Sequence, residues 1–234
     1  MINKIKSMLC ISLMSICITS LVNAQENNYS NLNNNHEIVA KYEHGGKGYE
    51  AIAKDSYGGY SYGKWQISTR RKDNQPSTFD YFLTYLKKNN NVYYEKLINA
   101  GGYESAFKGD PEFIATWKKV SKETSFKLTY DNFILDTQII PGYKRMEKED
   151  SQAFNQIINW GLNDKIIQAA IHSMIIQHGP IGSFKLIRKA LNGYELTTKE
   201  DFLKVVYETR KATYPKFIRR YNNEYRDLIN SMCS

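Results

Sequence analysis

The segment EHGGKGYEAIAKDSYGGYSYGKWQIS, residues 43–68, decides the fold class of this chain. In its second half, tyrosine and serine alternate around glycines, a composition typical of a β-hairpin and unlike that of a helix. If 60–68 is extended, Trp65 and Ile67 share one face, because successive side chains in a strand point to opposite sides. The other face then carries Tyr60, Tyr62, Lys64, Gln66 and Ser68. We therefore expect a hairpin with one buried face and one polar, aromatic face suited to water or to the wall of a cleft.

Most of the chain around this hairpin has the periodicity of helices. Apolar residues recur at intervals of three and four, which predicts helices within 38–43, 79–86, 110–120, 163–177, 181–192, 199–213 and 215–230. Segment 163–177 is apolar over more than half of its circumference, so we expect a buried central helix that ends at Gly179-Pro180. The sequence thus predicts an α+β fold, mainly α, with a large helical lobe and one small hairpin.

Two acids bracket the glycine-rich segment, Glu43 at the end of the first helix and Asp55 twelve residues later. Hydrolysis of a glycosidic bond needs a protonated acid for the leaving oxygen and a carboxylate that activates water or stabilises the cationic transition state. Glu43 suits the first role, since an apolar edge and a helix C-terminus both favour the protonated form. Asp55, beside Ser56 and the amides of a glycine-containing turn, suits the second.

Each of these acids also has a simpler interpretation, as a solvated residue at a helix end or as a turn former. Glu50 is a rival acid, but its neighbours predict a short helix from which it faces outward. His172 is expected to be a core residue of the apolar helix, whereas His178, just before Gly-Pro, is expected to border the cleft. No metal-ligand spacing, nucleophile elbow, phosphate loop or dinucleotide motif is present, so we expect neither metal nor cofactor.

The N-terminus has the features of an export signal. Residues 1–24 contain two early lysines, an apolar stretch too short to span a membrane and small residues before Ala24, where cleavage is expected. Residues 25–35 are rich in asparagine and predict a disordered leader, followed by one domain over 36–232. After cleavage, only Cys233 remains of three cysteines, which predicts a fold without internal disulfides. The mature protein is expected to be periplasmic or extracellular, monomeric and without a stable membrane anchor.

The run Glu43-His-Gly-Gly-Lys-Gly, then Asp55, then Gly58-Gly59-Tyr60-Ser61-Tyr62-Gly63-Lys64-Trp65-Gln66-Ile67-Ser68, resembles the active-site segment of lysozyme-like glycoside hydrolases. The likeness is greatest to chitosanase-like (family 46-like) domains, including peptidoglycan-cleaving domains of bacterial secretion-system spike proteins. It extends more loosely over most of 37–195. The resemblance implies a lysozyme-like fold with Glu43 as general acid and Asp55 as the residue that positions or deprotonates water, with an inverting outcome.

The substrate is expected to be a polysaccharide, because tyrosine rings stack on sugar faces and their hydroxyls bind sugar hydroxyls. Tyr57, Tyr60, Tyr62, Gln66 and His178 are the candidates for its binding. The net charge of +8 falls to +6 without residues 1–24, which favours anionic peptidoglycan over cationic chitosan. A chitosanase or a non-catalytic carbohydrate-binding module remains an alternative, whereas the dispersed charge and the lack of a known motif argue against nucleic acid. An immunity or delivery partner is compatible with the sequence but is not encoded in it.

Overall fold

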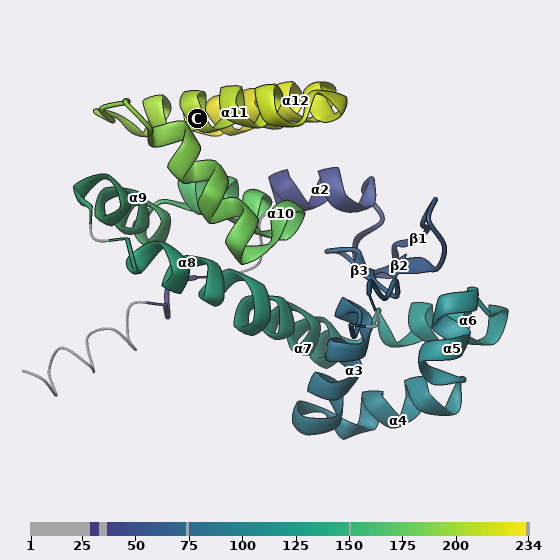
Figure 1. Ribbon diagram of the computed structural model, residues 1–234. Coiled ribbons are helices and arrows are strands. Elements are labelled where there is room, and N and C mark those ends of the chain that lie inside the picture. The colour runs from purple at the N-terminus through teal and green to yellow at the C-terminus, as the bar shows by residue number, and fades with distance from the viewer. Residues whose placement is uncertain (1–28, 33–36, 74, 150, 233–234) are drawn as a thin grey trace, which may run out of the picture. The chain divides into compact units, whose positions relative to one another are not determined.

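The computed structural model describes residues 29–32, 37–73, 75–149 and 151–232, and Figure 1 shows their arrangement. The helices are α2 (Glu37–His44), α3 (Thr78–Asn89), α4 (Asn91–Asn99), α5 (Gly102–Lys108), α6 (Pro111–Val120), α7 (Thr124–Ile134), α8 (Ile140–Glu147), α9 (Gln152–Asn163), α10 (Lys165–Leu191), α11 (Lys199–Thr213) and α12 (Ile218–Met232). Short 3₁₀ turns, η1 (Gly48–Glu50) and η3 (Pro215–Phe217), and a π-helix, η2 (Leu135–Ile139), lie between them. The predicted α+β class with a small β element is confirmed.

The β element is a three-stranded antiparallel sheet of β1 (Ile52–Lys54), β2 (Tyr60–Tyr62) and β3 (Ile67–Ser68). The expectation of one extended strand over 60–68 is wrong, because residues 63–66 form a turn in which Gln66 N donates to Gly63 O over 3.1 Å. Gly63 has a φ of 79°, and a Cβ there would lie 2.7 Å from the ring of Tyr130. The turn therefore packs against the core, which explains why Lys64, on the face expected to be polar, is buried.

Several predicted helices are confirmed together with the signals that begin and end them. Ser77 and Asp80 form a capping box at the start of α3, and Asp110 caps α6, in which Pro111 is the first residue. Helix α11 has the predicted bounds, and α10 leaves helical geometry at Gly179, where φ is 71° and ψ is 169°. The sequence interpretation missed α4, α5 and α7 to α9.

One core of the domain lies under the sheet and consists of aromatic rings. Tyr62 of β2 packs on Trp117 of α6, with ring centroids 5.0 Å apart, and Phe82 of α3 packs on Phe133 of α7 at 5.2 Å. All four side chains are fully buried. The sheet is therefore anchored through its aromatic side chains to α3, α6 and α7.

The second core surrounds the first half of α10, which packs against α2, α8, α9 and α11. Its apolar residues Ile167, Ile171 and Ile175 are fully buried, as the sequence predicts for a central helix. Helices α7 and α8 form one long run, interrupted only by η2, that reaches from the first core to the second (Figure 1).

Residues 1–28, which include the predicted signal segment, lie outside the described residues, as do 33–36 and Cys233. Four residues of the predicted leader, 29–32, form a turn in which Leu32 N donates to Tyr29 O over 3.0 Å. Within the described part of the chain, no helix has the length and apolar character needed to cross a membrane.

Candidate functional site

Glu43 lies in the last turn of α2, which buries Val39 and Ala40 and packs on α10 and α12. Two glycines with positive φ, Gly45 and Gly46, follow the helix and turn the chain toward the sheet. The Glu43 carboxyl is held by α12, because Arg220 Nη2 donates to its Oε1 atom. Their side chains are only 12% and 18% exposed. Glu43 is thus partnered by a cation and does not simply lie at an apolar edge, as the sequence interpretation assumed.

Arg220 belongs to a chain of alternating charges that continues into the second core. Its Nε atom lies 3.5 Å from Glu224 Oε2, and Glu224 Oε1 accepts from Tyr207 at 2.5 Å and from Arg210 at 3.2 Å. Glu224 and Arg210 are fully buried. Burial acts to raise the pKa of Glu224, but the charges of Arg210 and Arg220 outweigh it and hold the pKa below its usual value. Glu224 is therefore an ionised counter-charge for both arginines.

His178 lies at the break in α10, beside the same chain of charges. Its ring stacks on Tyr214, with centroids 4.5 Å apart and planes 14° from parallel. Burial, followed by the charges of Arg210 and Arg220, lowers the pKa of His178 to about 4. The imidazole is therefore neutral at pH 7, and its buried Nε2 has no hydrogen-bond partner among the described residues.

Asp55 follows β1 and forms the turn that joins it to β2. Its Oδ1 atom accepts from Tyr57 N at 2.9 Å, while Asp55 N donates to Gly59 O and Gly58 N to Asp55 O. One carboxylate oxygen is therefore used to shape the turn, and the second has no described partner. The Tyr57 ring is 78% exposed and lies 4.7 Å from the Arg70 guanidinium.

The remaining candidates of the hairpin have different surroundings. Tyr62 is fully buried and donates to Ala106 O at 2.8 Å, so the prediction that it binds substrate is wrong; it is a core residue because its strand faces α3 and α6. Tyr60 is half-buried against Gly109. Gln66 is half-buried, and its Nε2 atom donates to Gly63 O at 2.9 Å. Substrate binding by Tyr60 and Gln66 stays a prediction.

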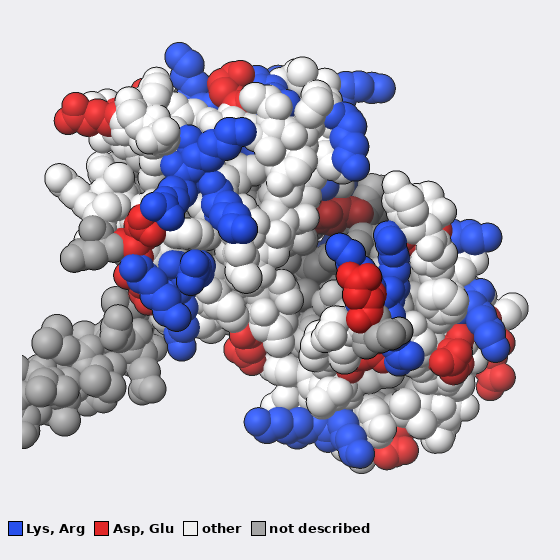
Figure 2. Space-filling view, viewed as in Figure 1, with Lys and Arg blue, Asp and Glu red and all other residues white. Residues whose placement is uncertain are grey.

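Figure 2 shows a hollow in the surface between the part over α2 and α12 and the part over the sheet, with acidic and basic side chains on its walls. Glu43 lies in α2 and His178 in α10, whereas Asp55 directly follows β1 of the sheet. Glu50 lies in η1, half-exposed, with its carboxylate 3.9 Å from Lys122 Nζ. Arg220 and Glu224 were missed, although their spacing of four residues in a predicted helix is the pattern of an ion pair.

The mainly helical fold with its small antiparallel sheet is similar to the lysozyme-like fold of solved chitosanases. Chitosanase OU01 crystallised with substrate is similar with a TM-score of 0.53 and 14% identity over 80% of this chain and 86% of that chain. A second chitosanase complex is similar with a TM-score of 0.51 and 14% identity, over 80% of this chain and 87% of that chain. Native chitosanase from Bacillus subtilis MY002 is similar with a TM-score of 0.50 and 17% identity, over 82% of this chain and 83% of that chain. At these identities the likeness shows the fold.

The family follows from the sequence itself. Residues 36–233 match the family model "Type VI secretion system spike protein VgrG3-like, C-terminal", and the chain belongs to this family. No curated protein matches it. Among the described residues, no group of three or more His, Cys, Asp or Glu side chains is placed to hold a metal ion.

Proposed function

We propose that this chain is an exported glycoside hydrolase that cleaves β-1,4 bonds of peptidoglycan, in the manner of a muramidase. Glu43 is the general acid and Asp55 the residue that positions and deprotonates the attacking water. The observation that carries the proposal is the setting of Glu43, whose carboxyl is largely buried and is held by Arg220 from another helix. The contact with Arg220 holds this carboxyl in one position, as is required of a group that acts on a bound substrate.

In the proposed mechanism, the two oxygens of Glu43 have different roles. Arg220 binds Oε1, while Oε2 has no described partner and is available to give its proton to the leaving oxygen. Glu224 neutralises Arg220 on its other side, which keeps the arginine in place. One oxygen of Asp55, which has no partner among the described residues, is the oxygen assigned to the attacking water. A separation of the two carboxyls of about 6.5–9.5 Å leaves room for that water and is expected for the proposed inverting reaction.

Peptidoglycan is the favoured substrate because the chain is basic, with a net charge of +8 that falls to +6 without residues 1–24, and peptidoglycan is anionic. Chitosan is the second candidate, and the chitosanases among the similar structures favour it. The family's description as part of a secretion-system spike supports export and a delivery partner.

Release of reducing ends from purified peptidoglycan, chitosan and chitin, measured side by side, tests the proposal. We expect release from peptidoglycan above all. Release from chitosan alone would show that chitosan, and not peptidoglycan, is the substrate. If no polymer releases reducing ends, the hydrolase proposal is wrong and a carbohydrate-binding module is the remaining alternative. The anomer of the first product, followed by NMR, reports on inversion.

A further inference from the structure

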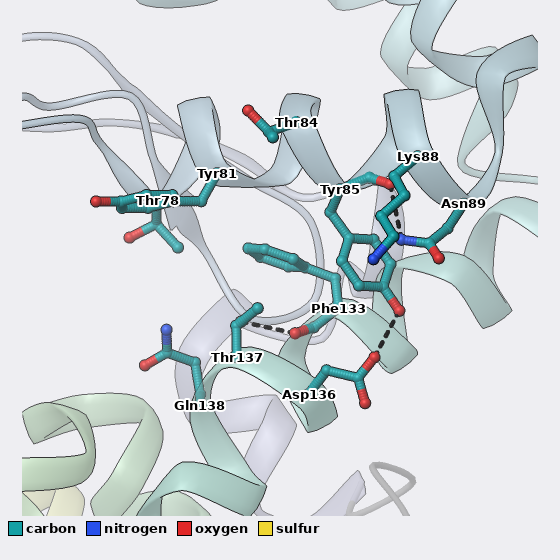
Figure 3. Close-up of a pocket in the computed structure, with 10 residues that line it drawn as sticks. All are labelled: Thr78, Tyr81, Thr84, Tyr85, Lys88, Asn89, Phe133, Asp136, Thr137 and Gln138. Atoms are coloured by element: carbon teal, nitrogen blue, oxygen red, sulfur yellow. Dashed lines mark hydrogen bonds between the residues drawn. The ribbon is translucent and has the colours of Figure 1, made fainter.

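A cavity of about 650 Å³ lies between α3 and the end of α7 with η2, and neither proposed catalytic acid lines it. Figure 3 shows its walls, with Tyr81, Tyr85 and Lys88 from α3 on one side and Phe133, Asp136 and Gln138 on the other. Its volume lies in the range of small-molecule sites. The proposed function gives this cavity no role.

The second wall is formed by the π-helix η2, which interrupts the long helical run of α7 and α8. A π-turn inside a helical run is rare and frequently lies at a functional site. Here it places Asp136, Thr137 and Gln138 on the cavity. Asp136 Oδ2 accepts from Tyr85 at 2.8 Å, a bond that joins the two walls.

Several polar groups on these walls are available to a ligand. Within the described part of the chain, neither the Gln138 amide, the Lys88 ammonium nor the Tyr81 hydroxyl has a hydrogen-bond partner. The Tyr81 ring is 54% exposed, whereas Phe133 is fully buried and gives the cavity an apolar floor. Asn89 Nδ2 donates to Tyr85 O at 3.0 Å, which leaves its carbonyl oxygen as an acceptor.

This combination selects a chemical class. An exposed tyrosine ring matches the flat apolar face of a pyranose, and amide groups match its hydroxyls and an acetamido group. The opposite charges of Asp136 and Lys88 balance within the lining, so the cavity has no excess of negative charge with which to hold a protonated amino sugar. We propose that this cavity is an accessory subsite for N-acetylated aminosugar units of a glycan strand. The inference rests on the proposed function for its polymer and adds that the bound sugars are acetylated.

The neighbouring surface gives such a strand a path toward the sheet. A second hollow of about 540 Å³ shares Tyr81 and Thr84 with the cavity and continues to Arg71 and Asp73, just beyond β3. Arg71 is held there by Asp80 through bonds of 2.7 and 3.0 Å. The two hollows therefore adjoin at Tyr81 and Thr84, and the second reaches the segment that follows β3.

Calorimetric titration of the Glu43→Gln protein with tetramers of N-acetylglucosamine and of glucosamine tests the subsite without hydrolysis. We expect the acetylated tetramer to bind at least about 10-fold more tightly than the deacetylated one. Tyr81→Ala should weaken its binding about 10-fold, a loss of one stacked face. Lys88→Met should reduce the difference in affinity between the acetylated and the deacetylated tetramer. Tyr194→Ala, which removes another exposed tyrosine beside a different hollow, is the matched control and should bind like the parent.

Equal binding by the Tyr81→Ala protein, preference for the deacetylated tetramer or no binding would each overturn the subsite. The proposed function fails by another measurement, since it requires wild-type release of reducing ends. If the protein binds the acetylated tetramer through Tyr81 but cleaves no polymer, the proposed subsite stands and the proposed hydrolase activity is wrong.

Discussion

At the scale of single residues, Arg220 explains how a carboxylic acid can be kept in one position at the end of a short helix. It lies between Glu43 and Glu224 and contacts both. Because Glu224 is buried and ionised, movement of the Arg220 guanidinium would remove one of the two cations that compensate this buried charge. The position of the proposed acid is therefore set by α12, nearly 180 residues away in sequence.

The buried neutral imidazole of His178 predicts a pH dependence of stability. Its folded pKa is about 4, below the usual value of about 6.5, so the unfolded chain binds the extra proton first as the pH falls. Stability is therefore present above about pH 6.5 and is lost toward pH 4. The variant His178→Phe keeps a ring against Tyr214 but cannot bind the proton. With allowance for the partial exposure of His178, the free energy of unfolding of this variant should fall by about 1–2 kcal/mol less than that of wild type between pH 7 and pH 4.5.

Urea denaturation of both proteins at the two pH values measures this difference. The carboxylates titrate alike in both proteins, so they cancel from the comparison. An equal loss of stability in wild type and variant would show that His178 is not held neutral.

Single residues also show where sequence reasoning fails. The alternation around Tyr62 is typical of a continuous strand, but residues 63–66 form a turn in which Lys64 is buried, and Tyr62 of β2 packs on α3 and α6. Periodicity does not contain that information, because the turn depends on the close approach of Tyr130 to Gly63. Arg220 was missed for a similar reason: its partner Glu43 is distant in sequence, and only the packing of α2 on α12 brings them together.

At the scale of elements, the tight turn between β2 and β3 has no room for a side chain at Gly63, so a substitution there should destabilise the protein. Gly63→Ala should lower the free energy of unfolding by about 2–4 kcal/mol, from the positive φ and from overpacking against Tyr130. Gly46→Ala is the matched control, because its φ is also positive but no atom lies within 4 Å of the added Cβ, and it should cost about 1 kcal/mol. Thermal denaturation measures both, and equal shifts would contradict the packing of the turn.

The three C-terminal helices are joined by one buried side chain. Arg210 of α11 donates to Glu224 of α12 and to Ser173 and Gln177 of α10. Arg210→Met removes one partner of a buried ion pair and should cost about 3–5 kcal/mol, whereas the double variant with Glu224→Met should cost less than the single one. The exposed Arg226→Met on α12 should change stability by less than about 0.5 kcal/mol. A double variant less stable than Arg210→Met would contradict this account.

At the scale of the whole molecule, the class and much of the helical lobe could be predicted because they depend on local signals. The central helix, its end at Gly179 and the caps of α3 and α6 all follow from residues close in sequence. Helices α7 to α9 were missed, and the π-helix among them has no sequence signature. The cavity along α3 could not be predicted either, since it depends on which faces of α3 and η2 meet.

The proposed activity depends on Glu43, and its removal is the most direct test. The rate of reducing-end release from purified peptidoglycan should fall by about 10²–10⁴-fold in Glu43→Gln, since the general acid is lost while an amide can still accept from Arg220. Its thermal midpoint should stay close to that of wild type. Glu50→Gln, at the exposed rival acid, should keep both rate and midpoint. Retained turnover in Glu43→Gln, or equal losses in the two variants, would contradict the assignment of Glu43 as the catalytic acid.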